Sequence, residues 1–331
     1  MDKVVPAEWA PHLAMWLGFP SHADLWQEDL EAAQDEVAGL ARALAGPGRE
    51  RVRLMVHGEG AAAAERLLAG VDGIEIVPGR FGDIWLRDTG PIFLSASEAA
   101  AFRFNGWGGK YVLEGDDEVA AQIAGHAGAG LLNHSFVLEG GAVDHDGYGT
   151  VLTTRQCLLN ANRNSGWDQP TAERALAEAL GARRVLWLGE GLMNDHTDGH
   201  VDNLARFVAP GVAACPMAYG RNDPNAAAYD AAAEALAGMV DANDARLKVV
   251  RIPSPGRVTD EEGEVVAASH MNLLIANGAV VVPLYGDETA GRFAMEALES
   301  LFPGREVIGL PSRAILTGGG SFHCITQQEP A

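Results

Sequence analysis

Short apolar runs and longer stretches of helical periodicity alternate along most of the chain. Two of the pairs of short runs are joined by Asp-Gly or Asn-Gly, which are the strongest short-range signals of a β-hairpin. A helical stretch follows each predicted hairpin, and one more apolar run follows the helical stretch. The chain therefore predicts a repeated unit of two strands, a helix and a further strand.

Three such units lie between residues 138 and 310. Their hairpins turn at Asp146-Gly147, Pro210-Gly211 and Asn277-Gly278, and pair Leu138–Val143 with Gly149–Thr154, Asn203–Val208 with Val212–Cys215, and Met271–Ile275 with Ala279–Pro283. Helices are predicted at residues 29–44, 118–129, 171–180, 225–240 and 289–301, and further strands at residues 15–19, 51–56, 74–77, 184–188, 247–252 and 306–310.

Polar residues mark the start of successive units, near Asp88, Glu139, His200, His270 and Cys324. They recur about every 50–70 residues, a spacing typical of a propeller or a stacked array. About five units of this kind can close a ring, with the polar starts at its centre. The predicted fold is therefore α/β, a five-bladed, pseudo-symmetric α/β-propeller of ββαβ-type repeats. We expect residues 1–331 to form a single domain.

The amino-acid composition limits the classes of molecule that the protein can bind. The chain has 331 residues, 47% of them hydrophobic, and its 24 basic and 45 acidic residues give a net charge of −21. Such a charge argues against nucleic acid or an anionic membrane surface and is compatible with a cationic substrate. No apolar run is long enough to span a bilayer, and the first residues, Met1–Pro6, contain no apolar signal segment. We expect a soluble, cytoplasmic protein, and a homo-oligomer is compatible with the sequence.

The three cysteines differ in their surroundings. Cys157 and Cys215 lie in apolar segments and are expected in the core, and no CxxC pair indicates a disulfide framework or a Cys-rich zinc site. Cys324 instead follows His323 and the run Gly318–Gly320. Consecutive glycines are costly in ordered structure and suit a backbone that must approach a ligand closely. Cys324 is therefore a candidate nucleophile, the alternative being an inert buried thiol after a tight turn.

A second polar stretch runs from Asn194 to Asn203 and is rich in Asp and His. In an extended strand, His196, Asp198, His200 and Asp202 would point to one face. Such an arrangement indicates a site, and it leaves open a metal-dependent hydrolase that uses these four side chains as ligands. A network of hydrogen bonds within a turn is the structural alternative.

Two further motifs are less specific. Gly58–Ala63 fits a loosened dinucleotide-binding pattern, GxGxxA, which Ala-rich helices also produce by chance. Arg87 and Asp88 lie among apolar neighbours, where they can equally form a structural ion pair. Neither motif changes the prediction of a site around Cys324.

The ring would bring together at its centre one thiol, one imidazole and three carboxylates, those of Cys324, His200, Asp88, Glu139 and Asp202. A Cys/His pair alone suggests acyl transfer, but carboxylates around a thiolate disfavour that anion unless the substrate is itself cationic. A guanidinium supplies positive charge and a planar set of donors that pairs with carboxylates. The combination therefore predicts thiolate attack on a guanidinium carbon.

Several motifs resemble one known family over essentially the whole chain. They are the runs Pro6–Trp9, Asp83–Pro91, Phe104–Tyr111, Glu139–Gly141, Cys157–Asn164, Gly199–Asn203 and Gly320–Gln328. These runs are similar to those of the agmatine deiminase family, which includes bacterial-type peptidylarginine deiminases. The resemblance implies the five-bladed α/β-propeller (pentein fold) of the guanidine-modifying superfamily, with no metal and no other cofactor.

The resemblance also implies roles for the five polar residues. Cys324 would be the nucleophile and His200 the general acid and base, with Glu139 orienting the imidazole. Asp88 and Asp202 would hold the guanidinium nitrogens. The implied product of agmatine is N-carbamoylputrescine, on the route to putrescine, formed through a covalent thiouronium intermediate. A catalytically inactive, ligand-binding propeller is the remaining alternative.

The substrate's tail is less well defined. Trp85 resembles the aromatic residue that flanks the substrate in the family, and the resemblance of the run Gly320–Gln328 implies that Gly320 also contacts the substrate. Four residues before the catalytic histidine, where agmatine-specific relatives look acidic, this chain has His196. Either Asp195 or Asp198 then reads the distal amine of agmatine, or the substrate is another guanidine compound, such as arginine or peptidyl-arginine. The lack of room for a peptide-docking domain favours agmatine.

Overall fold

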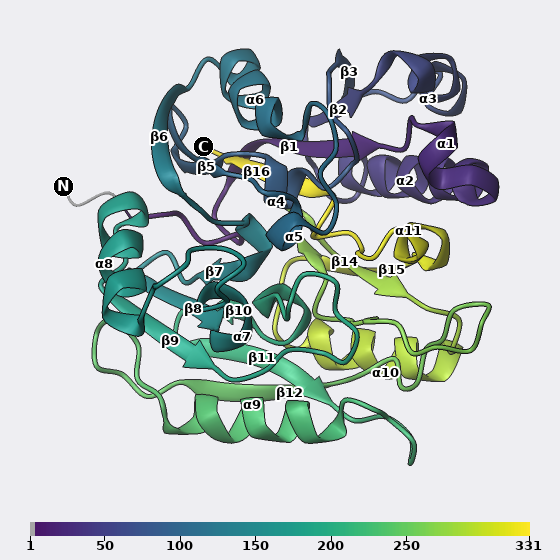
Figure 1. The fold of residues 1–331 in the computed structure, drawn as a ribbon. Helices are drawn as coiled ribbons and strands as arrows, with labels where there is room; N and C mark the ends of the chain where they lie inside the picture. The colour runs from purple at the N-terminus through teal and green to yellow at the C-terminus, as the bar shows by residue number, and fades with distance from the viewer. Residues whose placement is uncertain (1–3) are drawn as a thin grey trace.

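The computed structural model describes residues 4–331, so the first three residues of the expected polar N-terminus lie outside the described residues. Within these residues the strands form five small sheets (Figure 1). In the order of hydrogen-bonded neighbours, they are β16 (Thr326–Pro330), β1 (His12–Phe19), β2 (Val52–Val56) and β3 (Ile74–Pro78); β4 (Ile92–Ser95), β5 (Glu98–Arg103) and β6 (Gly130–Val137); β7 (Val143–His145), β8 (Thr150–Thr154) and β9 (Arg184–Leu188); β10 (Arg206–Ala209), β11 (Val212–Met217) and β12 (Lys248–Pro253); and β13 (Leu274–Ile275), β14 (Ala279–Leu284) and β15 (Glu306–Pro311).

Every sheet repeats one pairing pattern. Its first two strands are antiparallel, and its second and third are parallel. Parallel neighbours need a crossover, and a helix supplies it in each sheet. These helices are α2 (Leu30–Ala45), α6 (Val119–Ala127), α8 (Gln169–Leu180), α9 (Ala226–Gly238) and α10 (Glu288–Glu299), in agreement with the five predicted helices. The fold is therefore the five-bladed, pseudo-symmetric α/β-propeller that the sequence predicts.

The last strand of the chain completes the first sheet. β16 pairs antiparallel with β1, with Met15 opposite Gln328 and Leu17 opposite Thr326, so the purple and yellow ends of the ribbon lie side by side in Figure 1. This pairing fixes the segment that carries Cys324, which immediately precedes β16. The nucleophile candidate is thus held by a strand rather than by a free terminus.

Shorter helical segments connect the blades and position the polar residues. They are α1 (Ala23–Trp26), η1 (Gln27–Asp29), η2 (Gly58–Gly60), α3 (Ala61–Leu67), α4 (Leu86–Thr89), α5 (Gly106–Gly109), η3 (Asp116–Glu118), η4 (Gly140–Ala142), α7 (Arg155–Leu158), η5 (Val201–Asn203) and α11 (Arg313–Thr317). None of the described helices is both long and apolar enough to cross a membrane.

Three predicted strands begin later than expected, and one of them, predicted at residues 203–208, begins only at Arg206, after the 3-10 turn η5. Residues 140–142, predicted as part of a strand, form the 3-10 turn η4, and the strand begins only at Val143. A Cβ atom on Gly141 would lie 2.6 Å from His200 Nδ1, so this glycine pair brings backbone against the polar centre instead of continuing the sheet. Similarly, only Leu274 and Ile275 of the predicted run 271–275 pair as a strand.

Candidate active site

The glycine run before Cys324 packs against indole rings. Cβ atoms at Gly318 and Gly320 would lie 2.7 Å and 2.6 Å from the Trp85 ring, and Gly319 has a φ of +101°. Gly318 and Gly320 have no space for a side chain, and Gly319 has a backbone conformation that favours glycine. The run therefore brings the chain close to Trp85 and presents Cys324 beyond it, as the sequence predicts.

We expect Gly320→Ala to lower kcat/KM by at least about tenfold while the protein stays folded, because the added methyl group would lie 3.1 Å from Cys324 Cβ and displace the thiol. Steady-state kinetics and thermal melting measure the two effects. Gly189→Ala is the matched control, since its Cβ would meet no atom within 4 Å. Unchanged kinetics in Gly320→Ala would contradict this role for the glycine.

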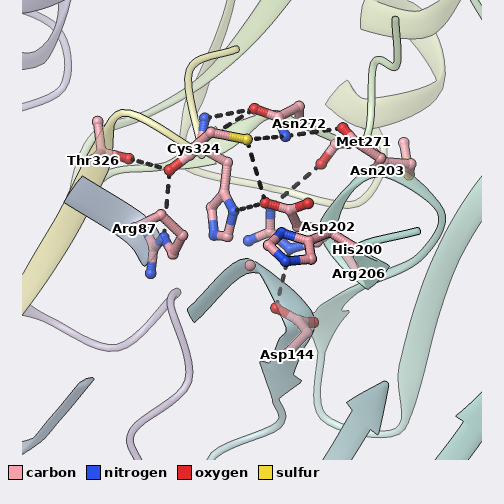
Figure 2. A network of polar contacts seen from close by, with 12 residues as sticks. Arg87, Asp144, His200, Asp202, Asn203, Arg206, Met271, Asn272, Cys324 and Thr326 are labelled. Carbon is pink, nitrogen blue, oxygen red and sulfur yellow. Dashed lines mark hydrogen bonds and ion pairs between the residues drawn. The ribbon is translucent and has the colours of Figure 1, made fainter. Parts of the chain in front are cut away.

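The Cys324 thiol lies between an amide and a carboxylate (Figure 2). Asn272 Nδ2 donates to Cys324 Sγ at 3.0 Å, and Sγ lies 3.6 Å from Asp202 Oδ2. The residue is only 4% exposed. Asn272 Oδ1 also accepts from the backbone amides of His323 and Cys324, so this one side chain fixes both the thiol and its backbone.

Asp88 lies in α4 and is held from two sides. Its Oδ1 accepts from Gly141 N at 2.9 Å and its Oδ2 accepts from Trp107 Nε1 at 2.9 Å. His200 Nδ1 is 3.8 Å from Asp88 Oδ2. These contacts place the carboxylate beside the imidazole, as expected from the sequence. Trp107 belongs to a motif whose chemical role the sequence left unassigned, and here it positions Asp88.

His200 is fully buried, and neither of its ring nitrogens has a hydrogen-bond partner among the described residues. Its backbone N–H donates to Thr197 Oγ1 at 3.0 Å, which fixes the residue without occupying the ring. Burial opposes its charge, but nearby Asp88, Cys157 and Glu139 raise the pKa of His200 well above its ordinary value. The imidazole is therefore protonated near neutral pH and able to act as an acid.

Glu139 contacts a cation that sequence reasoning did not pair with it. Its Oε1 accepts from Arg163 Nε at 2.7 Å, and Arg163 also contacts Asp198, which in turn accepts from Lys110 Nζ at 2.6 Å. Glu139 lies in one buried cluster with His200, without a direct hydrogen bond between the two. Its orienting role toward His200 remains a prediction that rests on proximity and charge.

Asp202 is fully buried, and a network of polar and charged side chains lies behind it. His323 Nδ1 lies 2.8 Å from Asp202 Oδ2, and His323 Nε2 lies 3.2 Å from Glu8. Arg206 completes this network through contacts with Glu8 and with Asp144, the second visible in Figure 2. Burial alone would raise the pKa of Asp202, but the His323 contact and nearby cations lower it. Asp202 therefore stays ionised, and its Oδ1 has no partner among the described residues.

The electrostatics keep the free thiol protonated. Burial and the negative charges of Asp202 and Asp88 raise the pKa of Cys324 well above the usual range of a thiol. A cation placed between these carboxylates would offset their effect and favour the thiolate. The site is therefore arranged so that a cationic substrate activates its own nucleophile.

The run from His196 to Asp202 is not a strand, so this part of the prediction was wrong. Asp198 and Gly199 have left-handed φ values of 64° and 85°, which break the expected alternation. His196 is exposed, Asp198 pairs with Lys110, and His200 and Asp202 are buried. The four side chains do not share a face, and the metal-ligand interpretation loses its geometric basis. Among residues 4–331, the group close enough to share an ion is Glu139, Cys157 and His200, of which only His200 belongs to the run.

Two other expectations are corrected. His270, predicted at the centre, contacts Pro253 O at 2.8 Å, and burial lowers its pKa to about 4; Asn272, two residues on, reaches the thiol instead. Arg87 does not form the ion pair considered for it with Asp88, because its NH1 donates to Gln327 and Gln328 at 2.7 Å each.

Cys157 lies in α7 and is fully buried, as expected, and its thiol lies beside His200 and Glu139. Cys215 is fully buried in β11, as expected. Sequence patterns separated neither thiol from an ordinary core residue, and only the fold shows that Cys157 lies beside the imidazole.

A cavity of about 380 Å³ leads to the thiol. Its lining includes Trp85, Asp88, Trp107, His196 and Cys324. Asp83, at the same cavity, accepts from the indole N–H groups of Trp26 and Trp85 at 3.0 Å and 2.6 Å, and burial raises its pKa to about 6. No lysine or arginine is among the described residues that line the cavity.

A five-bladed α/β-propeller with a buried thiol, an imidazole and carboxylates at its centre defines the guanidine-modifying class of proteins. The chain belongs to the Porphyromonas-type peptidyl-arginine deiminase family, whose model matches residues 4–330. It is 38% identical over 354 residues to the agmatine deiminase of Stutzerimonas stutzeri (strain A1501), covering 99% of this chain and 95% of that protein. It is 37% identical over 356 residues to the agmatine deiminase of Ectopseudomonas mendocina (strain ymp), covering 99% and 95%.

A solved structure agrees with these relatives. The agmatine deiminase of Enterococcus faecalis superposes with a TM-score of 0.92 at 33% identity, covering 99% of this chain and 96% of that one. The resemblance to the agmatine deiminase family is therefore confirmed.

Proposed function

We propose that this protein hydrolyses the guanidinium group of agmatine to N-carbamoylputrescine and ammonia. One observation carries the proposal: Asp202 Oδ1 and both ring nitrogens of His200 are buried without partners among the described residues, beside the Cys324 thiol. Unsatisfied buried polar atoms are costly and unusual. A guanidinium between Asp88 and Asp202 would supply the donor that Asp202 Oδ1 lacks and the positive charge that these carboxylates favour, while the unpartnered His200 nitrogens stay available for proton transfer.

The proposed reaction has two halves. Binding of the cation lowers the pKa of Cys324, and the thiol proton leaves to solvent. The thiolate attacks the guanidinium carbon, and protonated His200 gives its proton to departing ammonia. This leaves a thiouronium, bonded through Cys324 Sγ. Neutral His200 then takes one proton from water as the water oxygen attacks the same carbon. Collapse of this intermediate breaks the C–S bond and releases the thiolate and the ureido product, and the second proton leaves to solvent, where ammonia takes it up.

The cavity favours agmatine over arginine. Arginine differs by an α-carboxylate, which needs a cationic or hydrogen-bonding partner when it is bound. The described lining contains no lysine or arginine but does contain acidic side chains. We expect a panel of agmatine, arginine and a peptidyl-arginine, assayed for ammonia and ureido product, to show the highest kcat/KM for agmatine. A higher value for either of the others would reassign the substrate and leave the deiminase chemistry in place.

The proposal also covers the cellular compartment, the metabolic route and the domain organisation of the protein. Free cysteines at 157, 215 and 324 suit a reducing, cytoplasmic compartment, and the product would feed the synthesis of putrescine. Pairing of β16 with β1 supports the proposal that residues 1–331 act as one domain.

His196→Glu is expected to lower the KM for agmatine several-fold. His196 lies at the cavity with its Nδ1 3.1 Å from Tyr111 Oη, and a carboxylate there would attract the distal ammonium. Steady-state kinetics with agmatine and with butylguanidine, which lacks the amine, separate this effect from a general one. If the variant turns over agmatine less well and the wild-type protein prefers butylguanidine, the agmatine assignment fails.

A further inference from the structure

The distal ammonium of agmatine needs a counter-charge that His196 does not provide. His196 stacks on Tyr111, with ring centroids 5.8 Å apart and an angle of 21° between the rings. Lys110 Nζ donates to the His196 carbonyl at 2.8 Å, so this segment is held in place. An aromatic pair can contact an ammonium through its ring faces but cannot neutralise it.

Asp195 and Asp198, the two carboxylates that the sequence offers as binding partners of this ammonium, already have hydrogen-bond partners within the protein. Asp195 accepts from Thr197 N and Thr197 Oγ1 at 2.9 Å and 2.6 Å, and it is buried. Asp198 contacts Lys110, Asn162 and Arg163. Neither lines the cavity that holds Cys324. Both expectations from the sequence are therefore not supported by the geometry.

Two carboxylates at the cavity remain without partners. Glu28 and Asp29 line it together with Cys324, and neither side chain has a hydrogen bond or ion pair with any residue in the described part of the chain. The other acidic side chains of the lining, Asp83 and Asp88, accept indole or backbone N–H groups. Glu28 and Asp29 are thus the charges free to pair with a bound cation.

The backbone of this pair is well anchored. Trp26, two residues before Glu28, packs on Trp85 with ring centroids 6.3 Å apart and donates its indole N–H to Asp83 at 3.0 Å. α2 begins immediately after Asp29, at Leu30. The same tryptophan pair that borders the glycine run therefore fixes where the two carboxylates stand relative to the thiol.

We propose that Glu28 and Asp29 bind the distal ammonium of the substrate and so determine the specificity for a guanidine compound with a cationic tail. The inference rests on the proposed deiminase function. It assigns binding of the distal ammonium to η1 of the first blade, rather than to the segment around His196. Because Glu28 is exposed and Asp29 is half-buried, their effect is that of solvent-screened charges rather than of a buried ion pair.

The test compares two substrates of the same chain length. In the double variant Glu28→Gln/Asp29→Asn, the KM for agmatine is expected to rise about 2- to 30-fold, as for two lost solvent-screened charge contacts, with kcat within about twofold of wild type. kcat/KM for butylguanidine is expected to stay unchanged. Glu31→Gln/Asp35→Asn is the matched control: it removes two charges from the next turns, at exposed positions outside the cavity.

The outcomes separate the two proposals. A wild-type protein that releases no ammonia from agmatine overturns the function and the inference together. If wild type turns over agmatine but the double variant behaves like the control variant, or loses as much on butylguanidine as on agmatine, only the inference is overturned. Melting temperatures of all variants are expected to agree, because Glu28 and Asp29 stabilise no described contact.

Discussion

Cys324→Ser is expected to abolish deimination of agmatine, with kcat reduced by several orders of magnitude. Serine keeps the shape but has a far less acidic and less nucleophilic side chain, and the carboxylates that raise the pKa of the thiol would oppose an alkoxide even more strongly. Ammonia release over long incubations measures the residual rate. Substantial activity in this variant would contradict the covalent route.

The other two cysteines serve as controls. Cys215→Ala removes a buried thiol of β11 and should leave kinetics unchanged. Cys157→Ala should keep the covalent chemistry but move the alkaline limb of the kcat/KM profile to lower pH. The sign follows from the structure: contact with Cys157 helps raise the pKa of His200, so its loss lowers the pH at which the acid deprotonates.

Asp202→Asn is expected to change two observables in opposite directions. Turnover should fall, since losing one charged partner of a buried cation costs about 2–5 kcal/mol, or roughly 30- to 4,000-fold in kcat/KM. Thiol alkylation should become faster near neutral pH, because removal of the Asp202 charge lowers the pKa of Cys324. Asp88→Asn should show the same two changes.

The rate of inactivation by iodoacetamide as a function of pH measures the second effect. The midpoint should shift to lower pH in both variants and remain at the wild-type value in Asp230→Asn, which removes a surface carboxylate paired with Arg251. A variant that loses turnover while its thiol becomes harder to alkylate would show that the carboxylates do not act on Cys324 as described here.

Much of the fold could be predicted because its signals are local. The helix periodicities and the turns at Asp146-Gly147, Pro210-Gly211 and Asn277-Gly278 located three of the five blades. The β4–β5 hairpin was missed, since its turn at residues 96–97 contains no glycine and β5 begins Glu98-Ala99-Ala100-Ala101, a run of low β propensity. Here pairing with β6 and burial outweigh the local preference.

The sequence predicted only some of the residues that make up the site. Cys324, His200, Asp88 and Asp202 were found because their sequence motifs are unusual, and the fold brings them together. Asn272, Glu8 and Arg206 were not assigned, because their contacts depend on which blades meet at the centre and no spacing reports that. The alternation rule failed at His196–Asp202 because it assumes an extended backbone, which Asp198 and Gly199 do not have.

The central claim is that Cys324 forms a covalent thiouronium with agmatine. Intact-protein mass spectrometry of His200→Asn during turnover tests it most directly, since this variant can neither protonate ammonia nor activate water efficiently and should slow the reaction enough to trap the adduct. We predict a mass increase equal to agmatine less ammonia, located by peptide mapping on Cys324. Turnover that persists with no adduct in any slowed variant, and that is lost on chelation of metal ions, would contradict the account.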